Sequence, residues 1–173
     1  YDRKKDFHKV ATVVLDTETR PDGTKRRQTV IKFVPTINMD DWNRKCEWLY
    51  LFVIEGDIVK IGGTRDGLKG RCCSYNCGHH IPERGRSGDC SKTNGYIYNT
   101  FDFYLNLGFE IDMYGYRLEP HVFSVSIFDD ESMQVTAQIF HSYESRYIER
   151  FKTMYGFLPQ LCENSDPTYR MSD

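Results

Sequence analysis

Hydrophobic and polar residues alternate in two segments rich in β-branched side chains near the start of the chain, residues 8–19 and 25–36. The segments flank Arg20-Pro21-Asp22-Gly23, a sequence typical of a tight turn. This pattern predicts a β-hairpin, which we expect to form an N-terminal arm over residues 1–40. Four basic side chains surround the turn: Arg20, Lys25, Arg26 and Arg27. They form either a solvated tip or a contact with a phosphate backbone.

A second hairpin is predicted where a continuous apolar strand, residues 48–55, is followed by a Gly56-Asp57 turn and a strand at residues 58–62. Gly62-Gly63-Thr64 then ends the second strand. A helix follows that Thr64 or Asp66 caps and that ends near residue 77. The next segment, residues 78–91, is a polar, basic and glycine-rich loop, and its length is typical of functional or mobile loops.

The rest of the chain continues this mixture of helices and strands. Apolar spacing predicts a helix from Thr93 or Asn94 to Leu107, and a last helix from its cap, Ser142, to Tyr155. Two or three strands are expected between them, at residues 110–118, 121–128 and 133–140. We therefore predict an α+β fold in which a small antiparallel sheet with flanking helices occupies residues 41–163 and a loose tail occupies residues 164–173.

The composition narrows the class of protein. The chain has 173 residues, enough for one domain with its own core. Aromatic residues make up 14% of the sequence, which argues against intrinsic disorder. The longest apolar runs are too short to span a bilayer, so no membrane partner is expected. Because the sequence starts at Tyr1 and not at Met, we expect a trimmed chain or a piece of a longer protein.

Charge is divided unevenly along the chain, although the net charge is only −2. Residues 1–101 contain 18 Lys and Arg against 13 Asp and Glu, whereas residues 102–173 contain 5 against 12. This asymmetry indicates either a surface that faces a polyanion in the first part or an acidic region in the second.

The six cysteines do not form a disulfide pattern, and adjacent Cys72 and Cys73 favour reduced, partly buried thiols in a reducing, cytoplasmic compartment. The alternative is a structural zinc, because five residues that can ligate zinc fall within eighteen positions: Cys73, Cys77, His79, His80 and Cys90. No C-x-x-C pair supports this alternative.

Five residues stand out as a candidate site. Tyr50 and Lys60 lie on the two strands of the second hairpin, where both can face one side. Arg71 and Tyr75 are spaced i,i+4 on the following helix and share a face. Glu144 is expected in the first turn of the last helix. Each also has an ordinary structural explanation: a core tyrosine, a lysine that reaches solvent, a surface arginine or a helix-capping glutamate.

These residues carry a resemblance. Leu49-Tyr50-Leu51, Lys60-Ile61-Gly62 and Arg71, with Glu144 before Pro159, resemble the GIY-YIG nuclease superfamily. The likeness is to its small type II restriction endonuclease branch, in which Lys replaces the first Tyr of the second half-motif. The sequence departs from the pattern in two places. The first half-motif lacks its Gly and Ile, and Gln160-Leu161-Cys162 follows where many members have Asn.

The resemblance implies a GIY-YIG-like core and a sequence-specific double-stranded DNA endonuclease that uses one Mg²⁺, with Mn²⁺ as a substitute. Tyr50 is then the general base, assisted by the Lys60 ammonium, or Lys60 itself takes the proton. Arg71 holds the scissile phosphate, Tyr75 donates a hydrogen bond to it, and Glu144 binds the metal.

The resemblance also implies partners. Cleavage of both strands implies a homodimer on double-stranded DNA, and a methyltransferase that acts on the same site is a candidate partner. The polar and basic residues expected to contact DNA are Lys69, Asn76, Arg84, Arg86, Ser91, Lys92, Thr93 and Asn94. Two other functions stay open: a nuclease module of a longer homing or repair endonuclease, and a non-catalytic, zinc-containing DNA-binding module.

Overall fold

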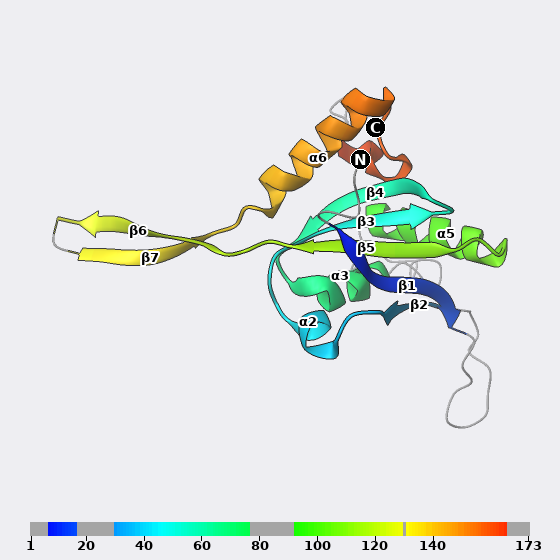
Figure 1. Cartoon of the computed structure of the whole chain (residues 1–173), viewed down its shortest axis with the longest axis horizontal. Helices are drawn as coiled ribbons and strands as arrows, with labels where there is room; N and C mark the ends of the chain where they lie inside the picture. The colour runs from blue at the N-terminus through cyan, green and yellow to red at the C-terminus, as the bar shows by residue number, and fades with distance from the viewer. Residues whose placement is uncertain (1–6, 17–29, 77–91, 130, 166–173) are drawn as a thin grey trace.

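The computed structural model describes residues 7–16, 30–76, 92–129 and 131–165. Five antiparallel strands form the main sheet in the order β2-β1-β5-β3-β4, and two further strands form a separate hairpin (Figure 1). The strands are β1 (His8–Asp16), β2 (Val30–Pro35), β3 (Trp48–Ile54), β4 (Asp57–Thr64), β5 (Ile111–Arg117), β6 (His121–Phe128) and β7 (Glu131–Ala137). The helices are α2 (Met39–Asn43), α3 (Gly67–Asn76), α5 (Lys92–Asn106), α6 (Phe140–Tyr155) and the 3₁₀ helix η2 (Gln160–Ser165). The predicted α+β class, with a small antiparallel sheet and flanking helices, is confirmed.

The first predicted hairpin forms, but it belongs to the main sheet. β1 pairs with β2 on one side and with β5 on the other. The paired strands of the hairpin therefore form one edge of the sheet, and their link to β5 is a long-range pairing that local sequence cannot reveal. The basic tip lies outside the described residues. The chain division at residues 40 and 163 stays a prediction.

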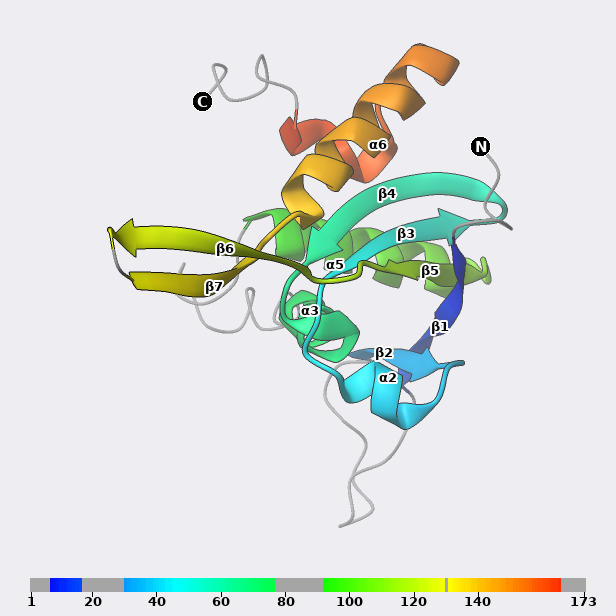
Figure 2. The same cartoon turned by 60° about the vertical axis from the view of Figure 1, so that its left-hand side comes forward.

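Helices cover both faces of the sheet, with α6 on one side and α3 on the other (Figures 1 and 2). β3 is buried along its whole length, and its side chains alternate between two cores. Tyr50 and Phe52 pack toward α3 and α5, whereas Leu49 and Leu51 pack toward α6. Burial on both faces explains the unbroken apolar run of this strand.

The second hairpin turns one residue earlier than predicted. Its central residues are Glu55 and Gly56, with φ angles of 48° and 92°, and Ile54 pairs with Asp57. Positive φ at both positions matches the twist of the flanking strands. A bulge after Phe52 shifts the register, so Lys60 pairs with Phe52, while Tyr50 pairs with Gly62. The strand also continues through the glycines that were predicted to end it, up to Thr64.

Glu47, which lies just before β3, connects the end of β5 to the start of α6. The backbone oxygen of Glu47 accepts a hydrogen bond from Leu118 N at 3.0 Å. Its carboxylate accepts from Ile139 N at 3.0 Å and Phe140 N at 3.3 Å. Glu47 therefore holds the chain at both ends of the β6–β7 segment and caps α6 through its side chain.

This cap replaces the predicted one. Ile139 occupies the N-cap position of α6 without a side-chain hydrogen bond, and Ser142 lies inside the helix, so the predicted cap was wrong. The carboxylate of Glu47, 92 residues away from Ile139, satisfies the free backbone amides instead. The helix ends at Gly156 as predicted, where φ is 79°. No described helix combines the length and apolar character needed to cross a membrane.

Candidate active site

Three of the predicted residues meet at one point between β3 and α3. The hydroxyl oxygens of Tyr50 and Tyr75 are 2.6 Å apart. Arg71 Nε donates to the Tyr50 hydroxyl at 2.8 Å, and the Arg71 guanidinium carbon lies 4.5 Å from the centre of the Tyr75 ring. The i,i+4 spacing on α3 and the inward position of Tyr50 on β3 create this contact. Tyr50 and Tyr75 are fully buried, whereas Arg71 is half-buried and lies toward solvent.

The protonation of this cluster follows from burial. Burial raises the pKa of the Tyr75 phenol well above its usual range, so Tyr75 keeps its proton. Burial disfavours the charge of Arg71, but the two phenol oxygens outweigh this effect and raise the pKa of the guanidinium. Arg71 is therefore a fixed cation. Because Arg71 already donates to Tyr50, we assign the proton between the two hydroxyls to Tyr75, so that Tyr50 accepts from both neighbours.

Gly62 and Gly63, at the end of β4, make room for the site on both faces of the sheet. A Cβ atom at Gly62 would overlap the ring and hydroxyl of Tyr50. A Cβ atom at Gly63 would lie 2.5 Å from Cδ2 of Phe140 and 3.3 Å from Oε2 of Glu144. Only hydrogen fits at either position. β4 therefore has no side chain at these two positions, so Tyr50 lies against its backbone on one face and Glu144 lies against it on the other.

Glu144 lies half-buried in the second turn of α6, because the helix starts at Phe140, earlier than predicted. Burial raises the pKa of its carboxyl above the usual value, against the opposing charges of Lys60, His141 and Arg71. Its charge is therefore only partly compensated by these neighbours. Such a carboxylate favours a cation beside it.

Lys60 is only 7% exposed, so it does not extend into solvent from an edge strand. Its ammonium lies within electrostatic reach of Glu144 and within hydrogen-bond reach of Cys162. Cys162 Sγ also accepts from Ile61 N at 3.2 Å and donates to Ile61 O at 3.3 Å. The buried thiol therefore joins η2 to the outer edge of β4. Sequence reasoning missed this role, although it noted that Cys162 stands in a departure from the family pattern.

The described residues do not contain a group of three or more His, Cys, Asp or Glu side chains that could hold a metal ion. Glu144 is thus a single protein carboxylate, a donor that suits a hard cation which keeps water ligands, such as Mg²⁺. Of the predicted zinc ligands, Cys73 is exposed on α3. Cys77, His79, His80 and Cys90 lie outside the described residues.

The predicted DNA contacts are only partly described. Lys69 is exposed on α3, and Asn76 is half-buried at its end. Asn94 Nδ2 donates to Ser74 O at 3.3 Å, which ties the start of α5 to α3 beside the tyrosine cluster. Thr93 is half-buried next to it, and Lys92 begins α5. Arg84, Arg86 and Ser91 lie outside the described residues.

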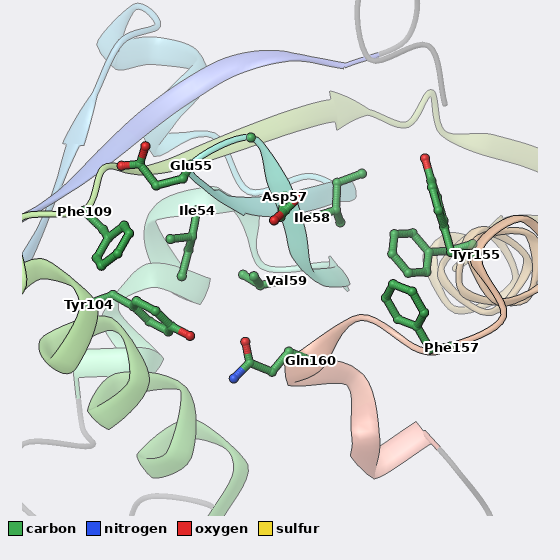
Figure 3. A pocket seen from close by; sticks show the side chains of 12 residues that line it. Ile54, Glu55, Asp57, Ile58, Val59, Tyr104, Phe109, Tyr155, Phe157 and Gln160 are labelled. Atoms are coloured by element: carbon green, nitrogen blue, oxygen red, sulfur yellow. The ribbon is translucent and has the colours of Figure 1, made fainter.

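A separate hollow of about 480 Å³ lies at the turn of the second hairpin (Figure 3). Aromatic side chains of α5 and of the end of α6 face it, together with the residues of the turn. Its lining residues are Ile54, Glu55, Gly56, Asp57, Ile58, Val59, Tyr104, Phe109, Phe151, Tyr155, Phe157 and Gln160. None of the predicted site residues contributes to it. The candidate site lies instead near the other end of β3.

Comparison with known proteins finds similar folds among solved structures. No protein-family model and no curated protein matches the sequence. Among solved structures, the chain is similar to restriction endonuclease HPY188I in complex with product DNA, with 21% identity and a TM-score of 0.53 over 93% of this chain and 82% of that one. It also matches a mutant of bacteriophage T4 EndoII, with 17% identity and a TM-score of 0.44 over 81% of this chain and 88% of that one. The chain thus shares the fold of the restriction endonuclease.

Proposed function

We propose that this chain is a DNA endonuclease of the GIY-YIG type, which hydrolyses double-stranded DNA at specific sequences with one Mg²⁺ per active site, as type II restriction enzymes do. The observation that carries this proposal is the cluster of Tyr50, Arg71 and Tyr75. Tyr50 lies against Gly62 on one face of β4, and Glu144 lies against Gly63 on the other face. Phosphodiester hydrolysis needs a base, a fixed positive charge and a metal ligand, and these four residues supply all three. The shared fold with a restriction endonuclease solved in complex with product DNA supports DNA as the substrate.

Tyr50 is the proposed general base. Its oxygen accepts from Arg71 Nε and, in our assignment, from Tyr75, and two donors on one oxygen favour negative charge there. A phenolate in this position can take a proton from the attacking water. Because Tyr50 is fully buried in the structure, water must gain access to its oxygen before Tyr50 can act as a base.

Arg71 is the proposed phosphate clamp. A guanidinium carries five N–H donors, and the structure directs Nε to Tyr50 and Nη1 to Ser74 Oγ at 3.4 Å. The half-buried side chain has further donors for the scissile phosphate and for the negative charge that grows in the transition state. Tyr75 keeps its proton and is the proposed second donor to the phosphate, once its single O–H turns away from Tyr50.

Glu144 is the proposed metal ligand. Its half-buried and partly compensated carboxylate fits a single hard cation, and a bound Mg²⁺ supplies positive charge to the phosphate and to the leaving 3′ oxygen. Mn²⁺ is expected to substitute, since it accepts the same oxygen ligands. Lys60 lies near Glu144, and its charge opposes part of the effect of burial on the Glu144 carboxyl.

The wider assembly follows from the same proposal. The proposed DNA contacts in the described part of the chain belong to α3 and to the start of α5: Lys69, Asn76, Lys92, Thr93 and Asn94. Cleavage of both strands requires two active sites, so a homodimer is the proposed working form. A methyltransferase with the same recognition sequence is the proposed partner in the cell.

Digestion of a plasmid of known sequence tests the function. Discrete fragments that require Mg²⁺ or Mn²⁺ and disappear with EDTA are expected. Arg71→Ala should lose cleavage, whereas Arg65→Ala, at an exposed position on the same segment, should keep it. A smear would contradict sequence specificity. Binding of DNA without any cleavage, with one zinc per chain in elemental analysis, would instead establish the zinc-containing binding module.

A further inference from the structure

The β6–β7 hairpin projects from the body of the molecule, as two views separated by 60° show (Figures 1 and 2). It is an excursion between β5 and α6, and Glu47 holds the chain at both of its ends. Among the described residues, each strand makes its extensive contacts with the other strand alone. Both faces of the hairpin are therefore open within the described part of the chain.

The two faces differ in chemistry. Directly opposed pairs on one face are Phe123 with Val135 and Val125 with Met133. Phe123 and Met133 are each 48% exposed. The next pairs along the strands, which point to the other face, are Ser124 with Gln134 and Ser126 with Ser132. Gln134 Nε2 donates to Ser124 Oγ at 2.6 Å, so these two side chains satisfy each other. The pair beyond them on this face, Val122 with Thr136, contains its one apolar side chain among the directly opposed pairs.

The apolar face of this hairpin has no cover among the described residues. Alternating apolar and polar positions are typical of a sheet that has one face buried and the other exposed to solvent. A two-stranded hairpin alone is marginally stable in water, and it needs further strands or packing to persist. The apolar face thus has the composition of a surface that another molecule covers.

Charge decides which class of molecule fits. β6 and β7 contain no Lys or Arg, and Asp129 and Glu131 make the turn between them acidic. A DNA backbone would be repelled by this hairpin, since DNA binding relies on basic side chains. Between the Phe123–Val135 and Val125–Met133 pairs the apolar face carries no charged side chain, so the same face of a second copy can pack on it about a twofold axis.

We infer that the apolar face of the β6–β7 hairpin packs against the same face of a second copy of this chain. The inference rests on the proposed function in one respect, that two active sites must act on one duplex. The hairpin leaves the main sheet at the end that holds the site, because Trp48 pairs with both Thr64 and Arg117, two positions from Tyr50. Contact through the hairpins therefore brings two active-site ends toward each other.

Sedimentation velocity of the full chain over a range of concentrations tests the inference with a matched pair of variants. Val125→Asp places a charge on the apolar face, and Ser124→Asp places the same charge on the polar face of the same strand. We expect the wild-type chain to be dimeric. Val125→Asp should weaken the dimer by about 30-fold or more, and Ser124→Asp by less than about threefold, since a charge in the centre of an apolar interface is costly. Equal effects of the two variants, or a monomeric wild-type chain, would overturn the inference.

Hydrogen exchange on the wild-type chain gives a second measurement that does not depend on how a variant folds. Amides of β6 and β7 should exchange more slowly at high protein concentration than at low concentration, and amides of α3 should not respond. A uniform response, or none, would contradict the proposed interface. The result is independent of the proposed function. A dimer that does not cleave DNA would support the hairpin interface and contradict the nuclease function. A monomer that cleaves DNA would support the nuclease function and contradict the hairpin interface.

Discussion

Gly62 lies directly opposite Tyr50 across the β3–β4 pair, and the Tyr50 phenol fills the space that any larger side chain at Gly62 would need. The half-motif Lys60-Ile61-Gly62 therefore ends in glycine for a steric reason. The tyrosine must lie against bare backbone to reach Arg71 and Tyr75 on α3.

Gly62→Ala should displace the Tyr50 ring and greatly reduce DNA cleavage. Overpacking at a buried position typically costs about 1–3 kcal/mol, so urea unfolding should show a loss of this size. Gly70→Ala is the matched control. Its new methyl group would meet only Cβ of Asp66 at 3.6 Å, and alanine is favoured over glycine inside a helix by about 0.5–1 kcal/mol. A Gly62→Ala protein with wild-type stability and activity would refute the steric argument.

Tyr75→Phe should lower kcat by about 10²-fold, the usual effect of removing one hydrogen-bond donor from a developing charge. The variant leaves Tyr50 with Arg71 as its single donor, so the Tyr50 oxygen loses one of the two hydrogen bonds that hold it in place. Tyr96→Phe, at an exposed position on α5, is the control and should leave kcat unchanged. A wild-type kcat in the Tyr75→Phe variant would reduce Tyr75 to a packing residue.

Glu144→Gln should abolish metal-dependent cleavage and stabilise the protein at neutral pH. Burial raises the folded-state pKa of Glu144, so the folded protein resists ionisation and loses stability as pH rises through the ordinary glutamate range toward the raised value. Glutamine has no charge and avoids this loss. Thermal unfolding at pH 7 should give a higher Tm for the variant, and the difference should vanish below about pH 4, where both forms are neutral. Glu149→Gln, exposed on the same helix, should change neither property in this way.

Cys162→Ala should destabilise the protein and perturb the site through Lys60. The change removes the sulfur that bonds both Ile61 N and Ile61 O, and a lost buried hydrogen-bond partner costs about 1–3 kcal/mol. It also removes the contact with the Lys60 ammonium, so the rate of cleavage should fall. Cys162→Ser retains a donor and an acceptor and should recover most of the stability and of the activity. Equal behaviour of the Ala and Ser variants would leave Cys162 with a packing role alone.

Local sequence pattern predicted the parts of the site that local structure determines. Arg71 and Tyr75 share a helix face because of their spacing, and Tyr50 is inside because β3 alternates between two cores. The turn of the second hairpin was misplaced because Glu55 takes a positive φ, which glycine adopts more readily than glutamate. The cap of α6 and the bond from Cys162 to β4 join residues 92 and 101 positions apart, and no local pattern reveals such pairs.

The hydrogen bonds of Glu47 allow the β6–β7 excursion to change without moving α6. Because this residue binds Leu118 on one side of the β6–β7 excursion and Ile139 and Phe140 on the other, the excursion begins and ends at one fixed point. Its length and its outer surface can then vary in evolution, or be exchanged between relatives, while α6 stays where it carries Glu144. The residues of the proposed active site and the surface proposed to bind a second copy can therefore change independently of each other.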